Sequence, residues 1–288
     1  MTTYDVRANP RVHFRVIHED EECVVVVKPA GVVTQPGKGH ENDSLLNGLC
    51  VRHGPALRAL GPPRDFGLLH RLDREASGLL VIALRQGGYD RLRSAFETRR
   101  VGKYYWAVVD GSPGAESGVI RRPIEEVQGR PRGEQGSRAR AGRGTMKLAR
   151  ISRAGKPAVT AYRVLKAGRG LSLVECRTLT GRLHQVRVHL ASIGCPIAGD
   201  DFYAPERLHG LAPRLALHAH RLVLPHSPGR VLDCRTAWPT DLRSLLTRFG
   251  IERPDDSDAA TLRAGGAVER DEELNDKGVG DHHPGVGE

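Results

Sequence analysis

Strand-like and helix-like segments both occur along the chain, which agrees with an α+β fold but does not establish it. Residues 101–111 are rich in valine and aromatic side chains, which is typical of strands. Residues 155–181 alternate in the pattern of two antiparallel strands joined by a short turn. In residues 88–99, apolar side chains recur at the spacing of an amphipathic helix.

Composition favours a folded protein that binds a polyanion. The chain has 288 residues, enough for one large domain or two small ones, and 39% of them are hydrophobic. Its net charge is +10, from 44 Lys and Arg against 34 Asp and Glu. Such a basic excess favours nucleic acid as a partner. Because only 5% of residues are aromatic, we do not expect a surface paved with stacking platforms.

The cysteines and the N-terminus indicate a cytoplasmic protein. The five cysteines are odd in number and contain no C-x-x-C pair, so we expect reduced, mostly buried thiols. The N-terminus lacks the apolar core of a signal peptide, and no apolar run is long enough to span a membrane.

The N-terminal part is expected to contain two strands and one helix. Residues 1–13 are predicted to be a loose arm, followed by strands at 14–18 and 23–28 around an acidic turn. A proline and several glycines then end the second strand in a pliable loop. Residues 44–53 are predicted to form a short helix, and 54–65 a loop.

Residues 67–83, GLLHRLDREASGLLVIA, place a polar block between two apolar flanks that both resemble strands. A carboxylate beside a buried strand, such as that of Asp73, costs free energy unless it is paired or hydrogen-bonded. In one interpretation Asp73 pairs with Arg71 or Arg74 and caps a turn. In the other it is a reactive group that its cationic neighbours keep ionised.

The C-terminal half adds a helix, a strand and a final helix. A helical apolar stripe is expected between residues 183 and 193, with Arg187 at its edge and able to reach inward. Residues 215–224 are predicted to be a strand and 241–249 the last helix. The stripe consists of Leu183, Val186, Leu190 and Ile193.

Two segments are too polar to bury much surface. Residues 129–144 are rich in Arg and Gly, which predicts a mobile insertion in a hairpin. Such segments often bind RNA without sequence preference, and a solvated loop without a partner is the alternative. Residues 252–288 are predicted to be a disordered acidic tail.

Several ordered motifs resemble the RluA-type RNA pseudouridine synthases. HRLDREASGLL is similar to that family's loop of HRLD, a polar pair and T-S-G-L, with Ala76 in place of Thr. GRLHQVRVH, followed by GCPIAGD and FY, is similar to a second motif, in which Leu183 and Cys195 depart from the usual residues. KYYWAVVDG resembles a third motif and KPAG a fourth, where Val27 replaces a common Asn.

The resemblance covers residues 14–250 and implies the fold in more detail. It implies one catalytic domain, residues 14–251, built on a long, mixed, mainly antiparallel β-sheet with flanking helices. The active cleft would lie across the middle of that sheet. Because only about a dozen residues precede 14, the small RNA-binding domain of many relatives is expected to be absent.

The resemblance also implies a reaction, in which uridines of ribosomal or transfer RNA are isomerised to pseudouridine. Asp73 would be the catalytic carboxylate, Tyr105 would pack against the uracil, and Arg187 would pair with Asp73. Tyr104 is expected on the opposite sheet face, because strand side chains alternate. Arg71 would help to reorganise the RNA around the flipped base.

Further residues are expected to bind RNA. They are His70, Arg71, Arg74, Lys28, Arg182 and His184. The enzyme is also expected to be a monomer that needs no metal or cofactor.

Two other functions compete. A metal-dependent hydrolase would use His218 and His220, which stand on one strand face, with His184, His189, Asp200 and Asp201 completing a site. A non-catalytic RNA-binding protein is the other alternative, although binding alone would not require Asp73, Tyr105 and Arg187 together.

Overall fold

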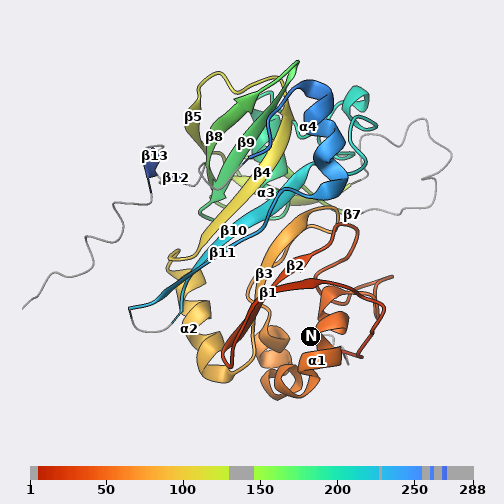
Figure 1. The fold of residues 1–288 in the computed structure, drawn as a ribbon, viewed down its shortest axis with the longest axis vertical. Coiled ribbons are helices and arrows are strands. Elements are labelled where there is room, and N and C mark those ends of the chain that lie inside the picture. Colours follow the sequence, from red (N-terminus) through yellow and green to blue (C-terminus); the bar gives the residue numbers. More distant parts are fainter. Residues whose placement is uncertain (1–5, 130–145, 227–228, 255–259, 263–267, 271–288) are drawn as a thin grey trace, which may run out of the picture.

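A computed structural model describes residues 6–129, 146–226, 229–254, 260–262 and 268–270. The chain is organised around one nine-stranded sheet (Figure 1). Its path is β1 (Arg15–Glu19), β2 (Cys23–Lys28), β3 (Ser77–Ala83), β10 (Leu217–Pro225), β4 (Gly102–Asp110), β9 (Leu171–Thr178), β8 (Val159–Ala167) and β5 (Ser117–Arg121), with β11 (Val231–Arg235) also paired to β10. Only the β3–β10 pair is parallel among these neighbours. The predicted α+β fold with a mixed, mainly antiparallel sheet is therefore confirmed.

The half of the sheet that contains β2 and β3 is covered on both faces. Val24 and Val26 pack with α1 (Leu45–Leu60), whereas Cys23 and Val25, one residue out of step, pack with α2 (Gln86–Glu97). Alternating side chains of a strand point to opposite faces. A strand covered on both faces is apolar throughout, which explains the unbroken valine run of β2.

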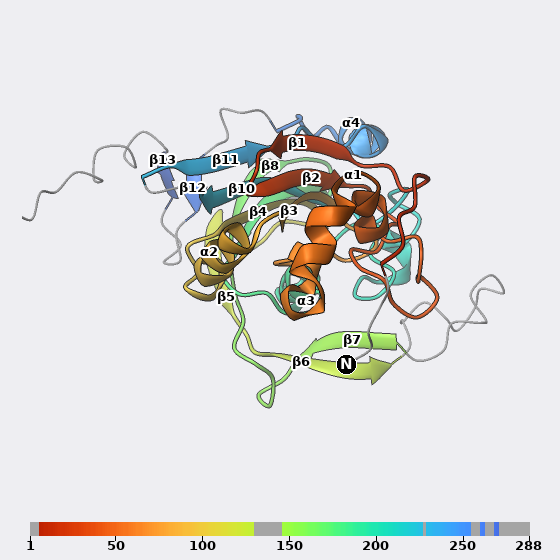
Figure 2. The same ribbon diagram turned by 90° about the horizontal axis from the view of Figure 1, so that it is seen from below.

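The other half of the sheet, β4, β9, β8 and β5, packs with α3 (Gln185–Ser192) and α4 (Arg243–Phe249) in the largest apolar cluster. A separate hairpin of β6 (Ile124–Gly129) and β7 (Met146–Ile151) lies away from the main sheet (Figure 2). Ile124 and Ala149 of this hairpin pack with Val188 of α3. Residues 130–145, which contain nearly all of the predicted insertion, lie outside the described residues.

The middle of the sheet depends on one glycine. Strands β3 and β10 pair at only two positions, Ser77 with His218 and Gly78 with Ala219. A Cβ at Gly78 would lie 2.3 Å from the carbonyl oxygen of Ala219, and its φ of 125° is one that L side chains rarely adopt. The glycine lets β3 approach β10 just after the loop that carries Asp73.

Some predicted boundaries are wrong. The helix expected at 44–53 continues to Leu60, because Leu57 and Leu60 extend its buried face past Pro55. The first flank of the HRLD stretch is not a strand, apart from a single bridge between Leu68 and Ile82. Leu183 lies before the start of α3 and packs against the hairpin cluster instead of the predicted helical stripe.

The ends of the chain also differ from the prediction. The arm is not loose over residues 6–13, since Val6 is buried with α1 and the Asn9 N–H donates to the carbonyl of Asn47 at 2.9 Å. In the tail, β12 (Ala260–Leu262) pairs antiparallel with β13 (Val268–Arg270), so the predicted disorder does not hold for those residues.

Short 3-10 turns complete the described elements: Pro62–Gly67, Glu206–Leu208 and Thr240–Leu242. The last of these turns leads directly into α4, so the final helix lies where the sequence predicts it. In the part of the chain that the structure describes, no helix combines the length and apolar character needed to cross a membrane.

Candidate active site

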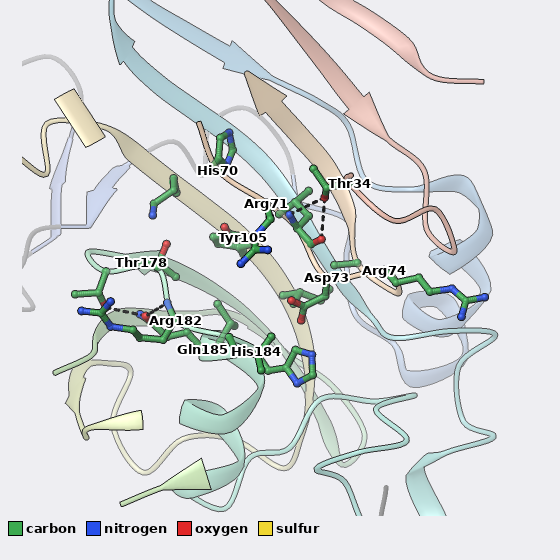
Figure 3. Close-up of a pocket in the computed structure, with 18 of the residues that line it drawn as sticks. Thr34, His70, Arg71, Asp73, Arg74, Tyr105, Thr178, Arg182, His184 and Gln185 are labelled. Carbon is green, nitrogen blue, oxygen red and sulfur yellow. Dashed lines mark hydrogen bonds between the residues drawn. The ribbon is translucent and has the colours of Figure 1, made fainter. Parts of the chain in front are cut away.

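A pocket of about 660 Å³ lies across the middle of the sheet, where the resemblance places the cleft. Its walls come from the loop before β3, from β4, from the turn that precedes α3, and from the hairpin residues Glu126 and Lys147 (Figure 3). A cavity of this size is typical of a small-molecule or nucleotide site.

Asp73 lies in the pocket wall, just before β3, with its side chain 20% exposed. Arg187 donates from Nη1 to its Oδ2 at 3.3 Å. Neither neighbouring arginine forms an ion pair with Asp73 in the described part of the chain. Arg74 donates from Nε to the Gly31 carbonyl, and Arg71 is exposed in the pocket wall. The ion pair expected from the resemblance is therefore present, whereas the local pairing with Arg71 or Arg74 is not.

Arg187 is held mainly by a different carboxylate. Its Nε and Nη2 donate to the two oxygens of Asp200 at 2.9 and 2.7 Å, while Nη1 faces Asp73 and lies 3.9 Å from Glu75. The ring of Phe202 lies 4.7 Å from the guanidinium carbon. The side chain is only 1% exposed. Two parallel hydrogen bonds fix the plane of the guanidinium group, so the remaining nitrogen is aimed at Asp73.

Asp200 is the site residue that sequence reasoning missed. The sequence predicts it only as a candidate metal ligand, yet it is fully buried and bonded to Arg187. Burial by itself would raise the pKa of Asp200, but hydrogen bonds and charge from Arg187, with N–H groups of Phe202 and Tyr203, lower it below its ordinary value. The sequence does contain a signal for such a residue, because an arginine inside a buried helix requires a buried anion as its partner.

Arg187 is shared unequally among the carboxylates around it. Arg187 carries one positive charge, which Asp200 balances through the shorter, bidentate contact. Burial opposes that charge, but the bonds and charges of Asp200, followed by Asp73 and Glu75, raise the pKa of Arg187 above its ordinary value. Arg187 thus orients the carboxylate of Asp73, while Asp200 makes the closer contact with its charge.

Tyr105 and Tyr104 point to opposite faces of β4, as the alternation predicts. Tyr105 lines the pocket, and burial raises the pKa of its phenol to about 12, so the ring is neutral at neutral pH. Tyr104 is buried on the other face, where Arg177 and Arg221 lie 5.5 and 5.2 Å from its ring.

Lys28 is not placed to contact RNA directly, which corrects the expectation for this residue. It is fully buried, and its Nζ donates to the carbonyls of Pro29, Val32 and Arg74 at 2.8, 2.7 and 3.2 Å. These three acceptors match the three N–H donors of an ammonium group. Burial lowers the pKa of Lys28 to about 7. The residue joins the loop after β2 to the loop that carries Asp73.

The other predicted RNA-binding residues all line the pocket. Arg71 makes no hydrogen bond or ion pair with another described residue, so its guanidinium is available to a ligand. Arg182 donates from Nε to the Pro157 carbonyl at 3.1 Å and remains half-buried. His184 adopts a left-handed φ of 49°, with its Nδ1 2.7 Å from the Tyr203 hydroxyl. His70 is half-buried, and its Nε2 accepts the Val81 N–H at 3.1 Å.

The predicted metal ligands do not assemble. His218 and His220 do share a face, since both stack on Trp106. However, His218 bonds to the Ser77 hydroxyl and His220 to the Glu175 carboxylate, each at 2.8 Å. Within the described residues, these side chains form no group with the spacing of a metal site.

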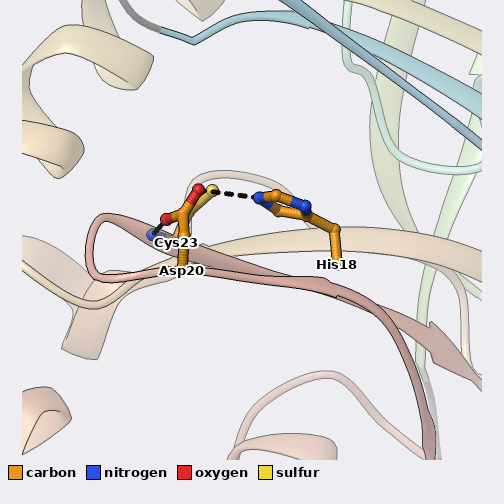
Figure 4. Close-up of side chains that lie close together, drawn as sticks. All are labelled: His18, Asp20 and Cys23. Atoms are coloured by element: carbon orange, nitrogen blue, oxygen red, sulfur yellow. Dashed lines mark hydrogen bonds and ion pairs between the residues drawn. The ribbon is translucent and has the colours of Figure 1, made fainter.

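The described residues do contain one such group elsewhere: His18, Asp20 and Cys23, at the β1–β2 turn (Figure 4). Asp20 caps this turn, because its Oδ1 accepts the N–H groups of Glu22 and Cys23. Its Oδ2 lies 2.7 Å from His18 Nε2 and 3.0 Å from His226 Nε2. None of these residues lines the pocket, so the group does not supply the predicted metal hydrolase site.

The site has the features that the resemblance implies: an oriented carboxylate, a tyrosine that faces it and a pocket in the middle of the sheet. Comparison with known proteins defines the class of protein. The family model described as RNA pseudouridylate synthase matches residues 22–192. The chain therefore belongs to the RNA pseudouridine synthase family, whose enzymes isomerise uridine in RNA to pseudouridine.

Several relatives of the chain are named as pseudouridine synthases of the large ribosomal subunit. The chain is 35% identical over 249 residues to ribosomal large subunit pseudouridine synthase D of Zymomonas mobilis, covering 83% of this chain and 74% of that protein. It is 32% identical over 233 residues to an uncharacterized RNA pseudouridine synthase of Synechocystis, covering 80% and 67%. The solved structure of human RNA pseudouridylate synthase domain containing 4 matches with a TM-score of 0.62 and 29% identity, over 84% of this chain and 95% of that one.

Proposed function

We propose that this enzyme isomerises uridines of large-subunit ribosomal RNA and that Asp73 is its catalytic carboxylate. The observation that carries the assignment of Asp73 is its position. It is a carboxylate in the pocket wall, oriented by a buried arginine whose charge Asp200 already balances. The RNA class is supported by relatives named ribosomal large subunit pseudouridine synthase D, which are 33–36% identical.

The reaction conserves every atom. The N1–C1′ bond breaks, the uracil turns, a C5–C1′ bond forms, and the proton lost from C5 is balanced by one gained at N1. A carboxylate can serve this reaction by bonding to the sugar or base, or by removing a ribose proton. Both routes need an ionised Asp73, and the Arg187–Asp200 pair keeps its oxygens aimed into the pocket.

The remaining residues would hold an extruded nucleotide. A base taken out of its stack costs a few kcal/mol, which contacts in the pocket must offset. The neutral ring of Tyr105 offers one apolar face to the uracil. Arg71, exposed at the pocket and free of partners among the described residues, would occupy the space that the base leaves in the RNA.

Ribosomal RNA as substrate also implies a cytoplasmic site of action, which is part of the proposal. Action as a monomer, without metal or cofactor, stays a prediction. No contact among the described residues favours the hydrolase, and a non-catalytic RNA-binding protein is the remaining alternative.

The decisive experiment measures tritium released from C5-labelled uridine in ribosomal and transfer RNA. We expect release by the wild type, with and without chelator, and none by Asp73→Ala. Asp90→Asn, an exposed acidic residue of α2, is the matched control and should behave like the wild type. Absence of release from both RNAs by the wild type would favour the RNA-binding alternative, and release by Asp73→Ala would remove Asp73 from the mechanism.

A further inference from the structure

Three residues form a part of the pocket that the reaction does not use. They are His70, Phe96 and Lys103, here called the Lys103 corner, and all three line the pocket. The Phe96 ring joins them, because its centroid lies 5.0 Å from the His70 ring and 5.8 Å from Lys103 Nζ. Lys103 lies two residues before Tyr105 on β4, so both side chains point to the same sheet face. Figure 3 shows His70 and Asp73 on either side of Tyr105.

Lys103 lacks a counter-ion within the part of the chain that the structure describes. Among the described residues its ammonium group has no hydrogen bond and no ion pair, and it lies 5.8 Å from the centroid of the Phe96 ring. Burial lowers the pKa of Lys103 to about 8, and no carboxylate opposes this shift. Lys28 is a useful contrast, because its fully buried ammonium has three carbonyl acceptors, whereas Lys103 is only half-buried and has none among the described residues. A desolvated cation without an acceptor indicates that the acceptor comes from a ligand.

His70 adds a second donor. Because its Nε2 accepts the Val81 N–H, the ring proton must lie on Nδ1. Burial, and then the charge of Lys103, lower the pKa of His70 to about 3, so the ring is neutral. Nδ1 is buried and has no acceptor among the described residues. The Lys103 corner therefore presents a cation to the pocket, with an enclosed N–H donor in the same corner that lacks an acceptor among the described residues.

We propose that the Lys103 corner binds a backbone phosphate of the RNA, next to the nucleotide whose uracil faces Tyr105. This inference rests on the proposed function, since it assumes that a uridine of RNA occupies the pocket. A phosphate carries a full negative charge and accepts several hydrogen bonds, which matches the cation of Lys103 and the N–H donor of His70. A uracil carbonyl would leave the charge of Lys103 unbalanced. The phosphate would make the pocket favour a nucleotide within RNA over a free nucleoside.

The test measures binding in a chemically inert background, Asp73→Asn, with short oligouridine at a series of KCl concentrations. Each phosphate contact with single-stranded nucleic acid contributes about 0.7 to the slope of log affinity against log salt. We expect Lys103→Met to weaken binding and to reduce the slope by about that amount. Lys166→Met, at a partly exposed lysine of β8 paired with Glu252, is the matched control and should leave the slope unchanged.

A second comparison separates phosphate from base. Uridine monophosphates should bind more tightly than uridine, and Lys103→Met should abolish that difference. An unchanged salt slope, or equal weakening of nucleotide and nucleoside, would overturn the proposal. Thermal melting of each variant shows whether a loss of binding reflects unfolding.

The outcomes also separate this proposal from the proposed function. If the wild type releases tritium and Lys103→Met leaves the slope unchanged, the phosphate site is wrong and the synthase stands. If the slope falls but the wild type releases no tritium, the phosphate site stands in an RNA-binding protein.

Discussion

The two sides of the pocket differ in how their charges are paired. On the Asp73 side, Arg187 is surrounded by acceptors from Asp200, Asp73 and Glu75, and Lys28 by three carbonyls. In the Lys103 corner, across Tyr105, a cation and an N–H donor have no acceptor among the described residues.

The difference in pairing corresponds to a difference in function between the two sides of the pocket. Buried charges that orient a carboxylate must be fully paired within the chain, because an unpaired buried charge costs several kcal/mol. In the Lys103 corner, the groups without a partner among the described residues are left for the phosphate that we propose there. The pairing of each charge therefore indicates whether it holds the site together or faces the RNA.

The largest expected effect comes from Arg187→Met. This substitution would leave two carboxylates without their cation, so we expect a loss of about 3–5 kcal/mol of unfolding free energy and of tritium release. The free energy is measured by denaturant unfolding. The double variant Arg187→Met with Asp200→Leu should recover much of the stability but not the activity. Recovery of activity as well would show that Arg187 has no part in orienting Asp73.

The two lysines give the sharpest test of the comparison. Lys28→Met removes a buried donor with three hydrogen bonds, and we expect it to lower the unfolding free energy by about 2–4 kcal/mol. Lys103→Met removes a cation that has no acceptor, so we expect a melting temperature equal to or above that of the wild type. Thermal melting of both variants without RNA measures this. If both are destabilised equally, Lys103 has a partner within the chain.

The pairing of Asp200 predicts a dependence of stability on pH. Because its pKa is lowered in the folded state, the contribution of Asp200 is fully present above its unfolded value of about 3.9 and is lost as pH falls through the folded pKa. We expect the unfolding free energy of the wild type to drop in that acid range more steeply than that of Asp200→Asn. Parallel curves for the two proteins would contradict the assigned ion pair.

The smallest expected effect on stability is that of Arg71→Ala. An exposed side chain without partners among the described residues should change the unfolding free energy by no more than about 0.5 kcal/mol. Catalytic efficiency with RNA should nevertheless fall roughly tenfold, which corresponds to about 1.4 kcal/mol. Tritium release at low RNA concentration measures this fall, and normal efficiency would remove Arg71 from the RNA contacts.

The sequence alone determined the features that depend on short-range patterns. Strand alternation placed Tyr105 and Tyr104 on opposite faces, and helical spacing located α2. The ordered motifs indicated the family, and with it the mixed sheet and the pairing of Asp73 with Arg187.

The tertiary structure decided which charges meet. Asp73 and Arg187 are 114 residues apart in the chain, and periodicity does not show that Asp200 holds Arg187 from the far side. Lys28 was expected at the RNA, because a Lys–Pro sequence does not reveal three carbonyls from two loops. Burial and pairing depend on contacts between distant segments, so the difference between the satisfied Lys28 and the unsatisfied Lys103 appears only once the chain is folded.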